Sequence, residues 1–246
     1  MSIPDIPKPA ETTGQTKSGL VWRIDGTVQQ TLLLDLDAGR TVYTDAGAMS
    51  WMTRAIQMRT YASGGLGGMF KRAISGATVF IVDFAAEGSA GQVAFSADFP
   101  GRIVPIELPP QASIIMHKHA FLAAEKSVQL DVFLTKRLGA GMFGGEGFVL
   151  QKLTGPGAVF AELDGDPFEY LLKPGETLRV EPGHVAMFEA TVTFDIEMIK
   201  GFTNVLMGGE GLFLATLTGP GRVWLHSLTP SKMAHRIAEY LPARSS

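Results

Sequence analysis

Two histidines stand two positions apart in the stretch HKH at residues 117–119, and a glutamate follows at position 125. Side chains two apart on a strand point to the same face of a sheet, so His117 and His119 could face one metal ion together. Imidazole nitrogens and carboxylate oxygens are ligands that transition metals accept, and Glu125 could supply the third. His184 and His226 are the other histidines that could complete such a site.

The sequence favours a turn over this metal site. The pair resembles the His-x-His of cupins, and it would make the chain a cupin-like metal-dependent enzyme using His117, His119 and Glu125. The corresponding position in a later repeat, however, reads EPG at 181–183, which is typical of a turn. We therefore expect the two histidines in an exposed turn, with no bound metal or other cofactor.

Three further patterns have a structural interpretation. GAGMFG at 139–144 fits the dinucleotide fingerprint, but the residues after it are typical of a strand, whereas the fingerprint needs a helix N-terminus at the phosphates. Glu146 and Glu210 each stand in GGEG, which indicates a tight turn or bulge with an exposed charge. Asp35 and Asp37 share one face of a predicted strand, and we expect that face to be solvated. No catalytic residue is predicted.

The composition limits the classes of partner. The formal net charge is −3 and the isoelectric point is near 6.0, so the chain as a whole does not attract nucleic acid or anionic lipid. There is no cysteine, which excludes disulfides and thiolate chemistry. The first residues are polar and proline-rich rather than apolar, which does not fit a secretory signal, and we expect a cytoplasmic protein.

The elements that would position these residues come in copies. Residues 144–160 match residues 208–224 at 11 of 17 positions, and the same offset of 64 residues continues on both sides. A weaker copy lies upstream, where LDLDAGRTVYTDAGAMS resembles LLKPGETLRVEPGHVAM. The predicted organisation is a disordered lead-in at 1–19, β-repeats at 20–100, 101–164 and 165–228, and a helix with a tail at 229–246, all in one globular unit.

Each copy consists of short apolar or alternating runs that Pro-Gly, Gly-Pro-Gly or Asp-Gly turns separate every 8 to 12 residues. This spacing predicts an all-β chain of three antiparallel sandwich or double-stranded β-helix units, arranged around a pseudo-threefold axis. After Thr229 and Pro230 the pattern changes to helical spacing, which predicts one helix over about 230–240.

Four stretches carry a resemblance to a known family: AGAMSWM at 46–52, SGGLGGMFKRAISG at 63–76, HAFLAAEKSVQLDV at 119–132 and GGEGFVLQKLTGPG at 144–157. Together they resemble the altered-inheritance-of-mitochondria-24 family, whose bacterial members have no known function. The resemblance implies a fold similar to that of the tryptophan RNA-binding attenuator protein, tripled within one chain. It implies no catalytic residues.

A glycine-flanked apolar pair precedes one strand of every copy, with basic residues nearby. If the copies surround one axis, these loops meet at one end and form an adaptable patch for a protein partner, self-association or a membrane surface. The sequence thus predicts a non-enzymatic scaffold or binding protein, with small-ligand or RNA binding left open by the attenuator resemblance. The apolar candidates are Met69, Phe70, Met142, Phe143, Leu206 and Met207, and their basic neighbours are Lys71, Arg72, Lys136, Arg137 and Lys200.

Overall fold

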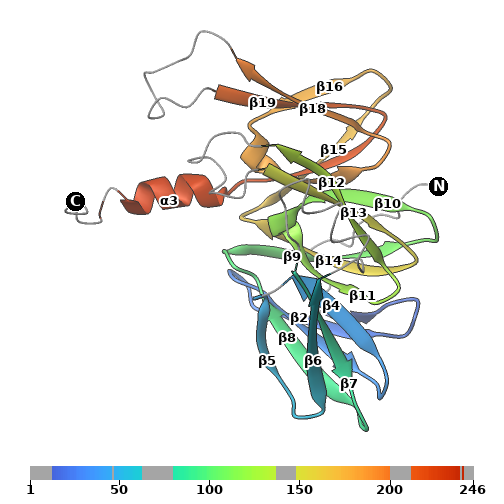
Figure 1. Ribbon diagram of the computed structural model, residues 1–246. Coiled ribbons are helices and arrows are strands. Elements are labelled where there is room, and N and C mark those ends of the chain that lie inside the picture. The colour runs from blue at the N-terminus through green and yellow to red at the C-terminus, as the bar shows by residue number, and fades with distance from the viewer. Residues whose placement is uncertain are drawn as a thin grey trace.

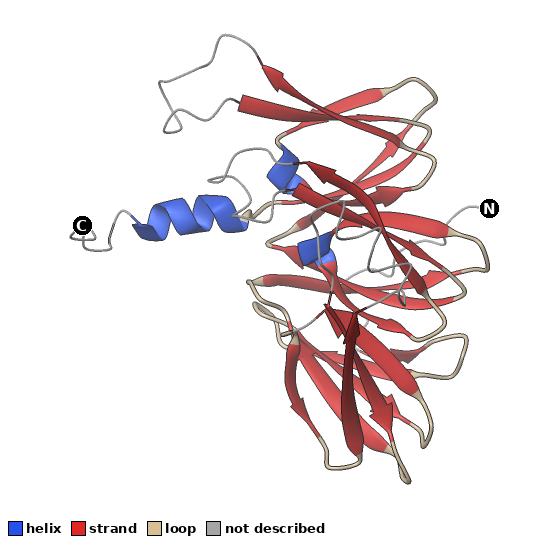
Figure 2. Cartoon of the chain, in the orientation of Figure 1, coloured by secondary structure: helices blue, strands red, loops and turns tan. Residues whose placement is uncertain are grey.

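The computed structural model of the 246-residue chain describes residues 13–45, 47–62, 80–136, 148–199, 212–238 and 240. Strands dominate this part of the chain, and the one α-helix in it stands apart from them (Figure 2). The prediction of an all-β protein is confirmed. The alternating apolar runs form the strands because each buries a face against a neighbouring sheet.

Three units follow one another, and each contributes six strands in the same order. Unit 1 contains β3 (Thr31–Leu36), β4 (Thr41–Asp45), β5 (Met49–Met52), β6 (Ile56–Ala62), β7 (Phe80–Ala86) and β8 (Gly91–Ser96). Unit 2 contains β9 (Gly101–Leu108), β10 (Ser113–His117), β11 (Phe121–Glu125), β12 (Gln129–Lys136), β13 (Phe148–Thr154) and β14 (Gly157–Asp164). Unit 3 contains β15 (Pro167–Leu172), β16 (Thr177–Val180), β17 (Val185–Glu189), β18 (Thr193–Ile199), β19 (Leu212–Thr218) and β20 (Gly221–His226).

Irregularities of the backbone recur at the same place in each unit. The third strand slips its register between Met49 and Trp51 in unit 1, between Phe121 and Ala123 in unit 2, and between Val185 and Met187 in unit 3. Units 2 and 3 also share a short 3-10 turn before that strand, η1 (Lys118–Ala120) and η3 (Pro182–His184). These shared features give a residue-by-residue correspondence between the units.

Neighbouring units share sheets. Sheet B has the order β6-β7-β4-β11-β14-β9, so its first three strands come from unit 1 and its last three from unit 2. Sheet C repeats this with units 2 and 3 in the order β12-β13-β10-β17-β20-β15. The second strand of one unit therefore pairs with the third strand of the next, as β4 with β11 and β10 with β17.

The two ends of the row carry incomplete sheets. Sheet A has the order β1-β2-β3-β8-β5, in which β1 (Thr13–Gln15) and β2 (Val21–Asp25) precede unit 1, and sheet D has the order β16-β19-β18. Figure 1 shows the units as a row from unit 1 at the bottom to unit 3 at the top. A closed threefold arrangement would require β16 to pair with β5, and no such ladder occurs among the described residues. The pseudo-threefold part of the fold prediction is therefore not confirmed.

The row of sheets encloses three apolar cores, one between each pair of adjacent sheets. Side chains of β14 enter two of them, since Phe160 packs with the core beside sheet A while Val159 and Ala161 pack with the core beside sheet C. All eight residues of β14 are buried. A strand that is covered on both faces is expected to be apolar along its whole length. The sequence GAVFAELD fits this except at Glu162 and Asp164.

The two chain ends differ in how far they match the prediction. Helix α3 (Pro230–Ala238) confirms the expected C-terminal helix; it begins after Thr229, whose hydroxyl accepts a hydrogen bond from the Lys232 amide at 3.3 Å. The lead-in is not structureless throughout, because β1 (Thr13–Gln15) pairs with β2 (Val21–Asp25) at the edge of sheet A. The polar residues of this hairpin have partners far along the chain, which no local pattern could indicate.

Candidate functional site

The predicted interaction loops lie outside the described residues. This holds for the six apolar candidates Met69, Phe70, Met142, Phe143, Leu206 and Met207, and for the basic neighbours Lys71, Arg72, Arg137 and Lys200. It also holds for Glu146, Glu210 and the fingerprint-like segment 139–144. Lys136 ends β12, but its side chain is not among the described ones. The loop patch stays a prediction.

Only one of the two histidines of HKH lies in the exposed turn that the sequence predicts. His117 ends β10 and is buried, while His119 lies in η1 and is exposed. Their ring centroids are 5.2 Å apart, and the His117 ring lies 5.0 Å from that of Phe148. Partial loss of solvation lowers the pKa of both rings, and that of the buried His117 falls well below its usual value. The positive charge of Lys118 lowers both further, whereas Asp98 partly offsets the effect at His119. The part of the prediction that placed His117 in an exposed turn is wrong, because Phe148 of β13 covers it.

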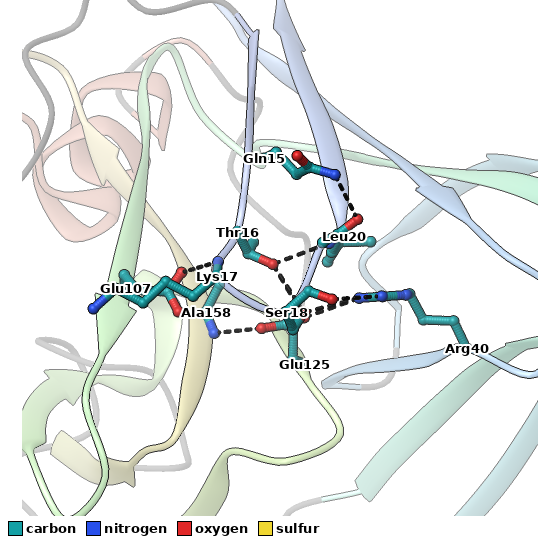
Figure 3. Close-up of polar contacts among 10 residues, drawn as sticks. Gln15, Thr16, Lys17, Ser18, Leu20, Arg40, Glu107, Glu125 and Ala158 are labelled. Atoms are coloured by element: carbon teal, nitrogen blue, oxygen red, sulfur yellow. Dashed lines mark hydrogen bonds and ion pairs between the residues drawn. The ribbon is translucent and has the colours of Figure 1, made fainter.

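Glu125 does not join the histidines. In Figure 3 its carboxylate faces the β1–β2 turn and the guanidinium of Arg40. Oε1 accepts hydrogen bonds from the hydroxyls of Ser18 and Thr16 and from Arg40 Nη1, and Oε2 accepts one of 2.8 Å from the Ala158 amide. Within the described part of the chain, no three His, Asp or Glu side chains form a group that could hold a metal ion.

The same contact recurs in the other units. Glu189 of unit 3 stands where Glu125 stands, and its Oε2 accepts the Arg222 amide at 3.0 Å while Oε1 accepts Arg222 Nε at 2.9 Å. In unit 1 the hydroxyl of Thr53 accepts the Gln92 amide at 2.9 Å. A side-chain acceptor at or just after the end of the third strand thus accepts the amide of the second residue of the sixth strand in every unit. We infer that Glu125 stabilises the fold.

The glycine before that amide is required for the contact. Gly157 has a φ of +135° and Gly221 a φ of +144°, in the region that favours glycine. A Cβ on Gly157 would lie 2.6 Å from Ser127 Oγ and 3.3 Å from Glu125 Oε2. The glycine that ends each Gly-Pro-Gly motif therefore allows the strand start to approach the carboxylate. The repeated Gly-Pro-Gly motif and the repeated glutamate, which are distant in sequence, therefore form one contact in the folded chain.

A surface feature that the sequence did not reveal lies at the unit 3 end. An open pocket of about 440 Å³ lies between β15, β16, η3 and β20. Phe168 and Tyr170 line it and are 50% and 43% exposed, and Leu171 beside them on β15 is 72% exposed. Arg179, Glu181 and His184 give it a polar side. Phe168 and Tyr170 share one face of this edge strand and form an exposed apolar patch at the pocket, whereas Leu171 is exposed on the opposite face. Exposed apolar side chains on an edge strand are typical of an interaction surface.

The structure also buries a cluster of carboxyl groups that no motif indicated. Glu162 and Asp164 lie on β14 close to Asp98, whose amide donates to Glu162 at 3.0 Å. Burial, together with the neighbouring negative charges, raises the pKa of Glu162 to about 8 and that of Asp164 to about 7. The Asp164 amide donates to Nδ1 of the buried His226, whose pKa burial lowers to about 4. Between about pH 4 and pH 7 the two carboxyl groups are protonated and His226 is uncharged, which avoids buried charge.

This cluster predicts how stability depends on pH. A raised pKa means that the folded state holds the Glu162 proton more tightly than the unfolded state, whose value is 4.5. Stability should therefore fall as the pH rises from about 5 to 8. Glu162→Gln keeps an acceptor for the Asp98 amide and should reduce that fall by about 1–3 kcal/mol. Urea unfolding at several pH values measures it, with the exposed Glu87→Gln as control. An unchanged slope would contradict the burial argument.

The chain matches a known protein family. The family model for mitochondrial biogenesis AIM24 matches residues 22–228, which includes all three units. The chain belongs to the AIM24 family. This confirms the family resemblance predicted from the four sequence stretches. An uncharacterised protein of Streptococcus pyogenes serotype M6 is 29% identical over 232 residues, covering 91% of this chain and 92% of that protein.

A solved structure shows the same fold. The X-ray crystal structure of a Streptococcus pyogenes protein matches with a TM-score of 0.73 and 26% identity, covering 90% of this chain and all of that one. Neither relative's name states an activity or a ligand. Among the described residues of this AIM24 protein, no helix is long and apolar enough to cross a membrane. The similarity to the attenuator protein stays a prediction.

Proposed function

We propose that this AIM24 protein is a non-enzymatic scaffold or binding protein, and that the unit 3 end is one of its protein-binding surfaces. The observation that carries the proposal is the exposed patch of Phe168 and Tyr170 at the open pocket, on an edge strand that also exposes Leu171 on its other face. Burying these side chains against a partner would remove apolar surface from water, which is the main favourable term in protein association.

The chemistry of the other candidate residues supports a binding role over catalysis. Glu125, the third ligand of the metal hypothesis, is held by Ser18, Arg40 and the Ala158 amide. Asp35 and Asp37 are exposed, and Asp35 accepts a hydrogen bond from Gln92 at 2.7 Å. These carboxylates form structural contacts or face solvent. The Met and Phe loops predicted from sequence remain candidates for a second surface of the same scaffold.

A photo-crosslinking experiment tests the proposal. Phe168 is replaced by a photoreactive phenylalanine derivative in cells that make the protein, and adducts are identified by mass spectrometry. We expect a discrete protein adduct mapped to position 168. The matched control carries the same derivative in place of Val28, which is 69% exposed between β2 and β3 and away from the patch. Equal labelling at both positions, or none at position 168, would contradict a binding surface at the unit 3 end.

A further inference from the structure

Two strands at opposite ends of the row have an edge without a ladder in the described part of the chain. β5 ends sheet A and β16 ends sheet D. β5 is the third strand of unit 1 and β16 the second strand of unit 3. These are the two kinds of strand that pair where the units meet inside the chain, β4 with β11 and β10 with β17. The chain therefore presents one half of a junction at each end.

The internal junctions fix the register that a further junction would have. At β4–β11, Val42 lies opposite Glu125; at β10–β17, Ile114 lies opposite Glu189. The next ladder positions are Tyr43 with Ala124 and Ile115 with Phe188, and then Met116 with Met187. The corresponding residues at the open ends give three expected pairs. These are Leu178 with Thr53, Arg179 with Met52, and Val180 with Trp51.

Side chains that the internal junctions bury are exposed at the open ends. Trp51 corresponds to Ala123 and Met187, which are both fully buried, yet Trp51 is 51% exposed. The pairing of each unit's first and sixth strands aligns Phe168 with Val104 and Leu32, and Tyr170 with Ile106 and Leu34. All four counterparts in units 1 and 2 are buried, whereas both unit 3 residues are exposed.

The packing of the middle core shows what covers this surface. Met187 and Trp224 of unit 3 pack in one core with Val104 and Ile106 of unit 2. No later unit supplies the counterparts of Met187 and Trp224 over Phe168 and Tyr170, and the open pocket lies there. The counterparts in unit 1 are Trp51 and Ala94, which are ladder partners like Met187 and Trp224.

The aromatic member of this ladder pair is not on the same strand in every unit. The pair is Ala123 with Phe160 in unit 2, Met187 with Trp224 in unit 3, and Trp51 with Ala94 in unit 1. In each case one large aromatic ring is present, and in unit 1 it stands on the third strand rather than on the sixth. Trp51 could therefore fill the unit 3 pocket as Trp224 fills the corresponding space against unit 2.

We propose that copies of this chain assemble head to tail, with β16 of one copy pairing antiparallel with β5 of the next. Sheet D of one copy and sheet A of the next then form one continuous sheet like sheets B and C, and Trp51 of the second copy packs on Phe168 and Tyr170 of the first. The proposal rests on the proposed function, since it names the partner of the unit 3 surface. Such an interface is heterologous, so it builds a ring if the rotation closes and a filament if it does not.

Cysteine crosslinking tests the direction and the register. The chain has no cysteine of its own, so each introduced thiol is unique. Met52→Cys and Arg179→Cys are made in separate chains with tags of different size, mixed, and oxidised mildly. We expect a disulfide-linked heterodimer in the mixture and no linked dimer from either variant alone. The matched control is Met58→Cys on β6, a second edge strand, where Met58 is 44% exposed and Met52 is 37%.

Mass measurement by light scattering accompanies the crosslinking. Trp51→Glu should weaken association at least ten-fold, whereas Met58→Glu should leave the mass unchanged; both residues are exposed, so neither change should unfold the chain. A monomeric mass without crosslinks would overturn the proposal, as would a linked dimer of Met52→Cys with itself. If position 168 nevertheless crosslinks to a different protein, the binding role stands and self-assembly fails.

Discussion

Replacing Glu125 with alanine is expected to lower the free energy of unfolding by about 2–4 kcal/mol. The change removes the acceptor for Ser18, Thr16 and Arg40 and leaves the Ala158 amide without a partner inside the protein. It also releases the β1–β2 turn from unit 2, because the bonds from Ser18 and Thr16 to Glu125 join segments that are more than 100 residues apart in the chain. Urea unfolding at equilibrium, monitored by fluorescence and circular dichroism, measures the loss.

Two comparisons within the chain make this result specific. Glu87→Ala removes an exposed carboxylate that pairs with the exposed Arg59, and it should cost no more than about 1 kcal/mol. Glu189→Ala removes the same structural contact in unit 3 but releases only Arg222, so its effect should lie between the two. A loss below 1 kcal/mol for Glu125→Ala would show that the carboxylate is not structural. It would reopen its assignment as a metal ligand.

A second large effect is expected in the core between units 2 and 3. Phe188 is fully buried on β17, opposite Ile115 of β10. Its ring stacks on Phe194 at 5.5 Å, and Phe194 stacks on Phe148 at 5.7 Å. Phe188→Ala removes the apolar contacts and leaves a cavity, so we expect a loss of about 3–5 kcal/mol in the free energy of unfolding.

The control for Phe188→Ala is the same substitution at the exposed Phe168. Phe168→Ala should change the stability of the monomer by less than about 1 kcal/mol. Measurement at low protein concentration separates monomer stability from association. If the two substitutions cost the same, either Phe188 is not packed as described or Phe168 is buried by a partner under those conditions. Repeating the Phe168 measurement over a range of concentrations decides between these outcomes, because only the second depends on concentration.

The sequence predicts the units well because their signals are local. Gly-Pro-Gly turns and alternating apolar residues recur with the same offset, so the strands and the C-terminal helix could be placed before the structure was known. The turn that follows His117, at Lys118–Ala120, is also predicted, from the alignment of HKH with EPG at 181–183. The burial of His117 is not, because it depends on Phe148 in a strand that is adjacent only after folding.

The arrangement of the units could not be predicted from the repeats. An identical offset is expected whether three units close around an axis or follow one another in a row, since both use the same junction between neighbours. The difference lies in whether β16 meets β5, which depends on the rotation at each junction rather than on any residue pattern. The β1 strand was missed for a similar reason. Its neighbours Thr16 and Ser18 are polar, and they are fixed by Glu125.

The shared sheets also bear on how such a chain could change its length. A duplicated unit inserted at a boundary would find the complementary strand edge on either side, because every junction uses the same two strands in the same register. Whole units could thus be gained or lost without any new kind of contact. A cut inside a unit is different, since it would uncover a strand such as β14, whose every residue is buried. Variation among such chains should therefore come in steps of one unit.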